Sequence, residues 1–164
     1  MKTLYLIRHA KSSWDEIGLS DFERPLNSRG KKDVLVMGQR LKEAGILPQI
    51  IISSSANRAF TTAQSLAAQI GFNLDSIELE PRIYEASAKT LSSIINQIDD
   101  SKNIAFLIGH NPGFTYLAED LTGEHFGNIP TCGIVGIEFP IESWQYVSNN
   151  SGTCISYDYP KKIS

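Results

Sequence analysis

The sequence predicts an α/β fold built on a mostly parallel sheet, because short apolar runs alternate along the chain with segments of helical periodicity. Three of these runs are continuous, with no alternation between apolar and polar residues, as expected for strands that helices cover on both faces. They are Thr3–Ile7, Ile50–Ile52 and Ile104–Ile108.

Helices are predicted between and after these strands. Four segments combine apolar residues at helical spacing with a residue typical of a helix end: 34–44 before Gly45, 58–70 before Gly71, 91–98 after Ser87, and a shorter one from Pro112. Two later strands are predicted at Gly133–Phe139 and Thr153–Tyr159. Because no repeat, low-complexity tract or linker divides the chain, residues 1–164 are expected to form a single domain.

Composition excludes several classes of function. The net charge of −3 argues against a nucleic-acid surface and against a basic membrane patch. No run approaches the roughly 20 apolar residues of a membrane span, and no signal peptide is apparent at the start. Two cysteines do not make a disulfide framework. The expected partners therefore include neither nucleic acid nor membrane, and the expected location is the cytoplasm.

Chemically reactive residues follow three of the predicted strands. The first strand ends in Arg8-His9, the second is followed closely by Arg58, and a later one ends before His110. In open α/β sheets, ligands bind beyond the carboxyl ends of the strands. We therefore expect two histidines and two arginines to share one rim of the sheet.

Such a rim suits phosphoryl transfer. Guanidinium groups donate paired hydrogen bonds to phosphate oxygens and stay charged at physiological pH. A neutral imidazole with one nitrogen tied to the backbone presents the other nitrogen as a nucleophile, and a second, protonated histidine would stabilise negative charge on phosphoryl oxygens. The sequence has no evident Asp-rich cluster for Mg²⁺, so neither a metal nor another cofactor is expected.

Taken singly, each of these residues has a structural interpretation. A histidine at a strand end is usually structural, Arg8 could be a surface ion-pair partner, and Arg58 could be a solvated residue of a first helical turn. His125 is interpreted as a loop surface residue. Zinc binding is disfavoured because the three histidines are not closely spaced, and a serine hydrolase because no serine has the glycines of a nucleophile elbow. The case for a functional site therefore depends on all four residues meeting at the same edge of the sheet.

Several segments, in order along nearly the whole chain, resemble the histidine phosphatase superfamily, which is also called phosphoglycerate mutase-like. The similarity begins with Arg8-His9-Ala10, where Ala10 replaces the usual glycine in a way typical of the SixA-like phosphohistidine phosphatase branch. It continues through the segments RPLNSRG (24–30), SSSANRAFTTA (53–63), LIGHNPGF (107–114), IPTCGI (129–134) and YPKK (159–162). The resemblance implies a three-layer αβα sandwich.

The resemblance also implies roles for individual residues. His9 would be the nucleophile that becomes phosphorylated, Arg8 and Arg58 would bind the phosphoryl oxygens, and His110 would complete the phosphate pocket. Glu85 lies where many members of the superfamily carry a general acid. The chain departs from the pattern at Asn27, Ser55 and Thr61, which stand where threonine, proline and glutamine are usual. These departures bear on substrate placement more than on the chemistry.

Three functions remain in view. The short segment between Arg58 and Glu85 leaves little material for a lid, and a shallow pocket would suit phosphohistidine displayed on a protein. The first alternative is a phosphatase for small phosphoesters that uses Glu85 as general acid, since an ester oxygen must be protonated as it leaves. The second is a non-catalytic adaptor that binds phosphate.

Overall fold

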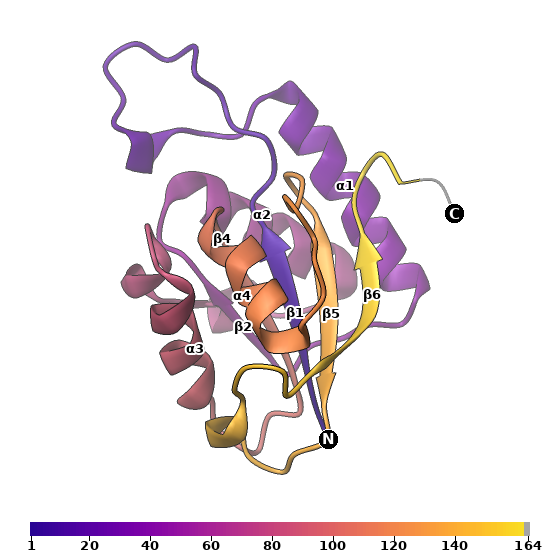
Figure 1. Ribbon diagram of the computed structural model, residues 1–164. Coiled ribbons are helices and arrows are strands. Elements are labelled where there is room, and N and C mark those ends of the chain that lie inside the picture. Colours follow the sequence, from indigo (N-terminus) through magenta and orange to yellow (C-terminus); the bar gives the residue numbers. More distant parts are fainter. Residues whose placement is uncertain (163–164) are drawn as a thin grey trace.

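The computed structural model describes residues 1–162, so the last two residues of the predicted domain lie outside the described part (Figure 1). The strands are β1 (Lys2–Arg8), β2 (Ile50–Ser53), β3 (Glu78–Leu79), β4 (Ile104–Gly109), β5 (Ile134–Phe139) and β6 (Thr153–Asp158). The helices are α1 (Ser28–Glu43), α2 (Asn57–Ile70), α3 (Ala88–Asn96) and α4 (Gly113–Thr122).

The six strands form one sheet in the order β3-β2-β4-β1-β5-β6. All the pairs on the β3 side of β1 are parallel, whereas β5 runs antiparallel to both of its neighbours, β1 and β6. Consequently β5 alone points against the other strands (Figure 1). The expected α/β fold with a mostly parallel sheet is confirmed.

Helices cover both faces of the sheet in three layers. Successive side chains of a strand point to opposite faces. In β1, Leu4 and Leu6 pack into the core with α3 and α4, while Tyr5 and Ile7 pack into the core with α1 and α2. A strand that is buried on both sides has no polar face, which explains why the runs in the sequence are continuous.

Most predicted helix ends agree with the structure. Gly71 follows α2 in the left-handed conformation at φ = 81°, and the Ser87 hydroxyl accepts a hydrogen bond from the backbone N–H of Thr90 at the start of α3. Other bounds differ. Helix α1 begins at Ser28, six residues before the predicted segment, α3 ends at Asn96 before the buried Ile98, and Pro112 stands just before α4 instead of inside it. The short strand β3 was not predicted.

The start of α1 packs against the loop that follows β1. The side chain of Asn27 accepts a hydrogen bond from the backbone N–H of Gly30 at 2.8 Å and so caps the helix. Gly30 is buried, and a Cβ atom there would overlap the backbone carbonyl of Lys11. A glycine at this position therefore lets the helix approach the loop closely.

We expect Gly30→Ala to lower the free energy of unfolding by about 1–3 kcal/mol, because the added methyl group overpacks a tight backbone contact. Urea denaturation measures this change, with Lys31→Ala as an exposed control on the same helix. An unchanged or higher stability in Gly30→Ala would show that the loop yields without cost.

Candidate active site

His9 lies immediately after the central strand β1 and is only 7% exposed. Its backbone N–H donates to the carbonyl of Gly109 at 2.9 Å, which fixes it against the end of β4. Its Nδ1 atom lies 2.7 Å from the carbonyl oxygen of Ala10. Because a carbonyl can only accept, Nδ1 carries the ring proton, and Nε2 has a free lone pair.

His110 lies just beyond β4, and its ring centroid is 5.2 Å from that of His9. Its Nε2 atom is 2.7 Å from the hydroxyl of Ser54, which also accepts a hydrogen bond from the backbone N–H of Ala56. The hydroxyl hydrogen is then available to His110 Nε2, an arrangement that favours a proton on Nδ1. Nδ1 itself is buried, without a hydrogen-bond partner in residues 1–162.

Both imidazoles are held in the neutral form. Burial lowers the pKa of His9 to about 4, and the nearby charges of Arg58, Arg8 and Arg24 act in the same direction. Burial also lowers the pKa of His110 to about 3, with further contributions from His9 and Arg58. A neutral His9 is the nucleophilic form. The protonated second histidine that the sequence suggested is not the form of this ligand-free site.

The two predicted arginines reach the site from different layers. Arg8 donates from Nη1 to the carbonyl of Ile129 at 2.8 Å, and burial lowers its pKa. Arg58, in the first turn of α2, is buried and donates to both the backbone carbonyl and the carboxylate of Asp21, at 2.6 and 3.0 Å. It is therefore not a solvated helix residue.

Three buried side-chain nitrogen atoms lack a hydrogen-bond partner within residues 1–162, and all belong to this site. They are Nε of Arg8, Nε of Arg58 and Nδ1 of His110. Buried donors are almost always paired in folded proteins, so unpaired ones call for an explanation. All three are donors, so the group that would pair with them is a hydrogen-bond acceptor, such as an oxyanion.

The sequence did not identify Asp21, Arg24 or Tyr84 as site residues. The Asp21 carboxylate accepts hydrogen bonds from Arg58, from Arg24 at 2.8 Å and from the Tyr84 hydroxyl at 2.5 Å. The hydrogen bond from Tyr84 is the largest cause that holds the pKa of Asp21 below its usual range, and the charges of Arg58 and Arg24 lower it further. In the sequence, Arg24 stands out only as the first residue of the segment RPLNSRG (24–30). No periodic pattern and no strand end marks Asp21 or Tyr84.

The segment between β1 and α1 borders the site, whereas the expectation about a lid concerned only the segment between Arg58 and Glu85. It extends beyond the carboxyl end of β1 (Figure 1) and carries Asp21 at the start of the short helix η1 (Asp21–Glu23). Arg24 anchors it, since its side chain donates to Ser13 and Ser12 and stacks 3.3 Å from the centre of the Trp14 ring.

Thr62 connects this loop to α2. The backbone N–H of Ala10, next to His9, donates to the Thr62 hydroxyl at 3.0 Å, and that hydroxyl donates to the carbonyl of Arg58 at 2.7 Å. The hydroxyl is fully buried. One side chain therefore joins the loop that carries His9 to the turn that carries Arg58.

Glu85 lies on the rim of the site. It is exposed and lines a cavity of about 560 Å³ together with Arg58, Tyr84 and His110. Its backbone has φ = 58°, which is uncommon for a residue with a side chain. His125 does not line this cavity, since its ring is 87% exposed and pairs with Glu119 at 3.1 Å.

Residues 1–162 contain neither a metal-binding cluster nor a membrane-spanning helix. No group of three or more His, Cys, Asp and Glu side chains is arranged to hold a metal ion. No helix in this range is long and apolar enough to cross a membrane.

Comparison with known proteins gives the class of this chain. Residues 4–129 match the histidine phosphatase superfamily (branch 1), and the chain belongs to that family. The resemblance inferred from the motifs is thereby confirmed at the level of the superfamily.

Individual relatives extend over nearly the whole chain. An uncharacterised chloroplastic protein of Arabidopsis thaliana is 33% identical over 159 residues, covering 92% of this chain and 72% of the relative. A SixA-type protein of Agrobacterium tumefaciens, assigned as a phosphohistidine phosphatase, superposes with a TM-score of 0.80 at 26% identity, covering 97% of this chain and 98% of that one. The protein histidine phosphatase SixA complexed with tungstate gives 0.81 at 21% identity, covering 96% and 97%.

We expect the rings of His9 and His110 to remain neutral in the ligand-free protein as the pH falls from 7 to 5, because their pKa values lie near 4 and 3. NMR titration of the ring protons measures this, with His9→Gln and His110→Gln used to assign the signals. Midpoints near 6.5 for both rings would contradict the neutral site. Unfolded histidines take up protons near pH 6.5, whereas these rings do so only near pH 4 and 3, so the free energy of unfolding falls as the pH drops from about 6.5 to about 3.

Proposed function

We propose that this protein is a SixA-like phosphatase that removes the phosphoryl group from phosphohistidine in a partner protein through a phosphohistidine intermediate on His9. The observation that carries the proposal is the set of three unpaired buried donors, on Arg8, Arg58 and His110, beside a neutral imidazole with a free Nε2. A phosphoryl group has three oxygens that could accept from these donors.

In the first step, Nε2 of His9 attacks phosphorus. The new P–N bond forms as the bond from phosphorus to the substrate's imidazole breaks, and the electron pair of that bond stays with the leaving nitrogen. The leaving ring departs neutral when its other nitrogen already carries a proton, so this reaction needs no protein acid. Arg8, Arg58 and His110 would stabilise the charge on the phosphoryl oxygens in the transition state.

In the second step, water attacks the phosphorylated His9. The P–N bond breaks and returns its electron pair to Nε2, while the water oxygen joins phosphorus and releases a proton to solvent. Inorganic phosphate leaves, and His9 regains the neutral form that burial favours. The hydrogen bond from Nδ1 to Ala10 holds the ring in one tautomer through both steps.

The second candidate is a phosphatase for small phosphoesters with Glu85 as general acid. Glu85 lines the same cavity as Arg58 and His110, which favours this candidate. An ester oxygen is a poor leaving group and gains from proton transfer, whereas a phosphoramidate does not depend on it. The two functions therefore differ in how much they require this carboxyl group.

We expect radioactive phosphate from a phosphohistidine phosphocarrier protein to be trapped on His9 after a rapid acid-free quench. His9→Ala should abolish both the trapped label and turnover, because it removes the attacking nitrogen. Arg58→Ala should retain labelling but lower kcat/KM by about 10²–10³-fold, as expected for loss of a charged transition-state contact. A folded protein that binds the phosphocarrier but never becomes labelled would identify an adaptor instead.

We expect Glu85→Gln to leave turnover of phosphohistidine within about 2-fold of the parent protein, while any hydrolysis of p-nitrophenyl phosphate falls by about 10²-fold or more. Turnover of both substrates by both proteins measures this. Fast hydrolysis of small esters, with no turnover of the phosphocarrier protein, would overturn the proposed substrate and favour the second candidate.

A further inference from the structure

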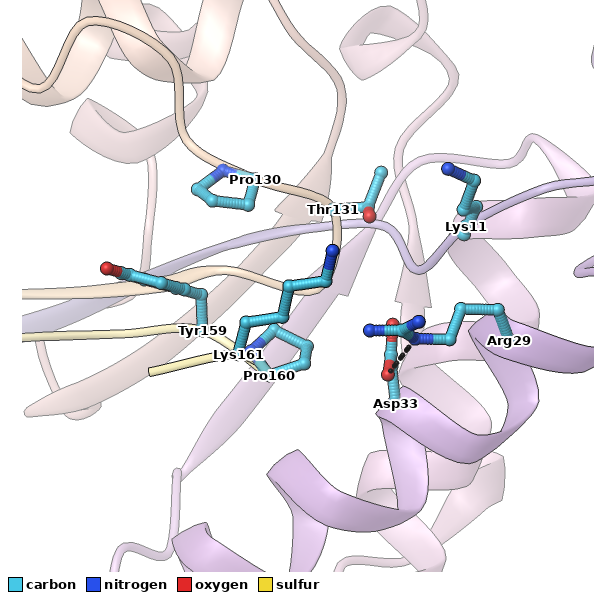
Figure 2. Close-up of a pocket in the computed structure, with 8 residues that line it drawn as sticks. All are labelled: Lys11, Arg29, Asp33, Pro130, Thr131, Tyr159, Pro160 and Lys161. Carbon is cyan, nitrogen blue, oxygen red and sulfur yellow. Dashed lines mark hydrogen bonds and ion pairs between the residues drawn. The ribbon is translucent and has the colours of Figure 1, made fainter. Parts of the chain in front are cut away.

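A second pocket, shown in Figure 2, is lined by Lys11, which lies two residues beyond His9. It has a volume of about 230 Å³ and is separate from the cavity that contains Arg58 and His110. Its lining combines basic side chains with a small apolar and hydroxylic surface: Lys11, Arg29, Asp33, Pro130, Thr131, Tyr159, Pro160 and Lys161.

Chain direction places the residues of the second pocket at the end of the sheet where His9 lies. Lys11 is two residues beyond His9, Arg29 is in the first turn of α1, and Lys161 follows β6, which runs in the same direction as β1. The loop that contains Ile129 and Thr131 contacts Arg8 and also lines the second pocket. The carbonyl of Ile129 accepts from Arg8 in the active site, and Thr131 lines the second pocket.

Positive charge predominates in this second pocket, although the whole chain has a net charge of −3. Three cationic side chains line it against one carboxylate, Asp33, which is held by Nε of Arg29 at 3.0 Å. Within residues 1–162, the two terminal nitrogens of Arg29 make no hydrogen bond, and neither Lys11 nor Lys161 makes an ion pair.

The cations are arranged for an exposed, extended ligand. In Figure 2 the amine of Lys161 points toward Thr131, and the guanidinium of Arg29 extends into the space beside Pro160. Lys11, Arg29 and Lys161 are all exposed at the surface. Long basic side chains around a small proline surface can follow a flexible acidic chain, and an acidic protein needs such a local patch to attract an acidic partner.

We propose that this pocket binds an acidic segment of the phosphorylated partner protein, next to the phosphohistidine that enters the active site. The proposal rests on the proposed function for the partner's phosphohistidine, but the pocket's preference for carboxylates can be measured without turnover. Charge complementarity at such a surface acts mainly on association, and salt weakens it.

The test uses two synthetic phosphohistidine peptides of equal length, one with several glutamates on both sides of the phosphohistidine and one with serines in their place. We expect kcat/KM for the acidic peptide to exceed that for the serine peptide by about 10-fold at low salt, and this ratio to shrink at high salt. Lys161→Glu should reduce the ratio to about 1–2, whereas Lys161→Arg should retain it.

Lys42→Glu is the matched control, because it makes the same charge change on an exposed residue at the opposite end of α1. It should keep the preference for the acidic peptide. If Lys42→Glu loses the preference as fully as Lys161→Glu, the effect comes from net charge and the pocket is not the binding site. A preference that survives in Lys161→Glu would also overturn the proposal.

Binding of the unphosphorylated acidic peptide to isotope-labelled protein separates this inference from the proposed function. We expect NMR shift changes at Thr131 and Lys161 that the serine peptide does not produce and that Lys161→Glu removes. These changes without any phosphatase turnover would overturn the proposed function and keep the pocket. Phosphatase turnover without NMR shift changes at Thr131 and Lys161 would keep the proposed function and overturn the proposed binding pocket.

Discussion

Burial of positive charge around His9 is the constraint on which the rest of the site depends. Arg24 and Arg58 are buried, and one carboxylate, that of Asp21, serves both of them. Burying unpaired charge costs several kcal/mol, so further cations are strongly disfavoured there. The two imidazoles respond by remaining neutral. The site thus combines neutral imidazoles with buried guanidinium groups.

The sheet brings these groups together through strand register. Arg8 in β1 pairs with Gly109 in β4, and Ser53 in β2 pairs with Ile108, so neighbouring strands end at nearly the same level. His9, His110 and Ser54 each follow one of these paired residues. The hydrogen bond between Ser54 and His110 then joins the second and fourth strands' ends directly. Short loops at one sheet edge suffice to bring these side chains together.

Sequence reasoning succeeded where burial imposes a pattern. Continuous apolar runs, glycines after helices and polar residues after strands follow from packing and backbone geometry, and they were enough to predict the layers and the convergence of Arg8, His9, Arg58 and His110. Their catalytic roles remain predictions. Strand β3 escaped notice because its two residues are exposed and carry no such pattern.

The loop between β1 and α1 could not be predicted from the sequence, for a different reason. Asp21 and Arg24 belong to an irregular segment whose shape depends on contacts between side chains, such as Arg24 with Trp14 and Asp21 with Tyr84. Periodicity has nothing to say about such contacts, since each depends on where a distant part of the chain lies. Glu85 shows the same limit in another way, because the resemblance to the superfamily, and no periodic pattern, indicated its place near the site.

The hydroxyl of Thr62 has a mechanical consequence. It accepts from the backbone beside His9 and donates to the backbone of Arg58, so a single buried oxygen links the central strand's exit to the outer helical layer. Neither element can slide past the other without breaking one of these bonds. The spacing between the His9 ring and the Arg58 guanidinium accordingly depends on that link.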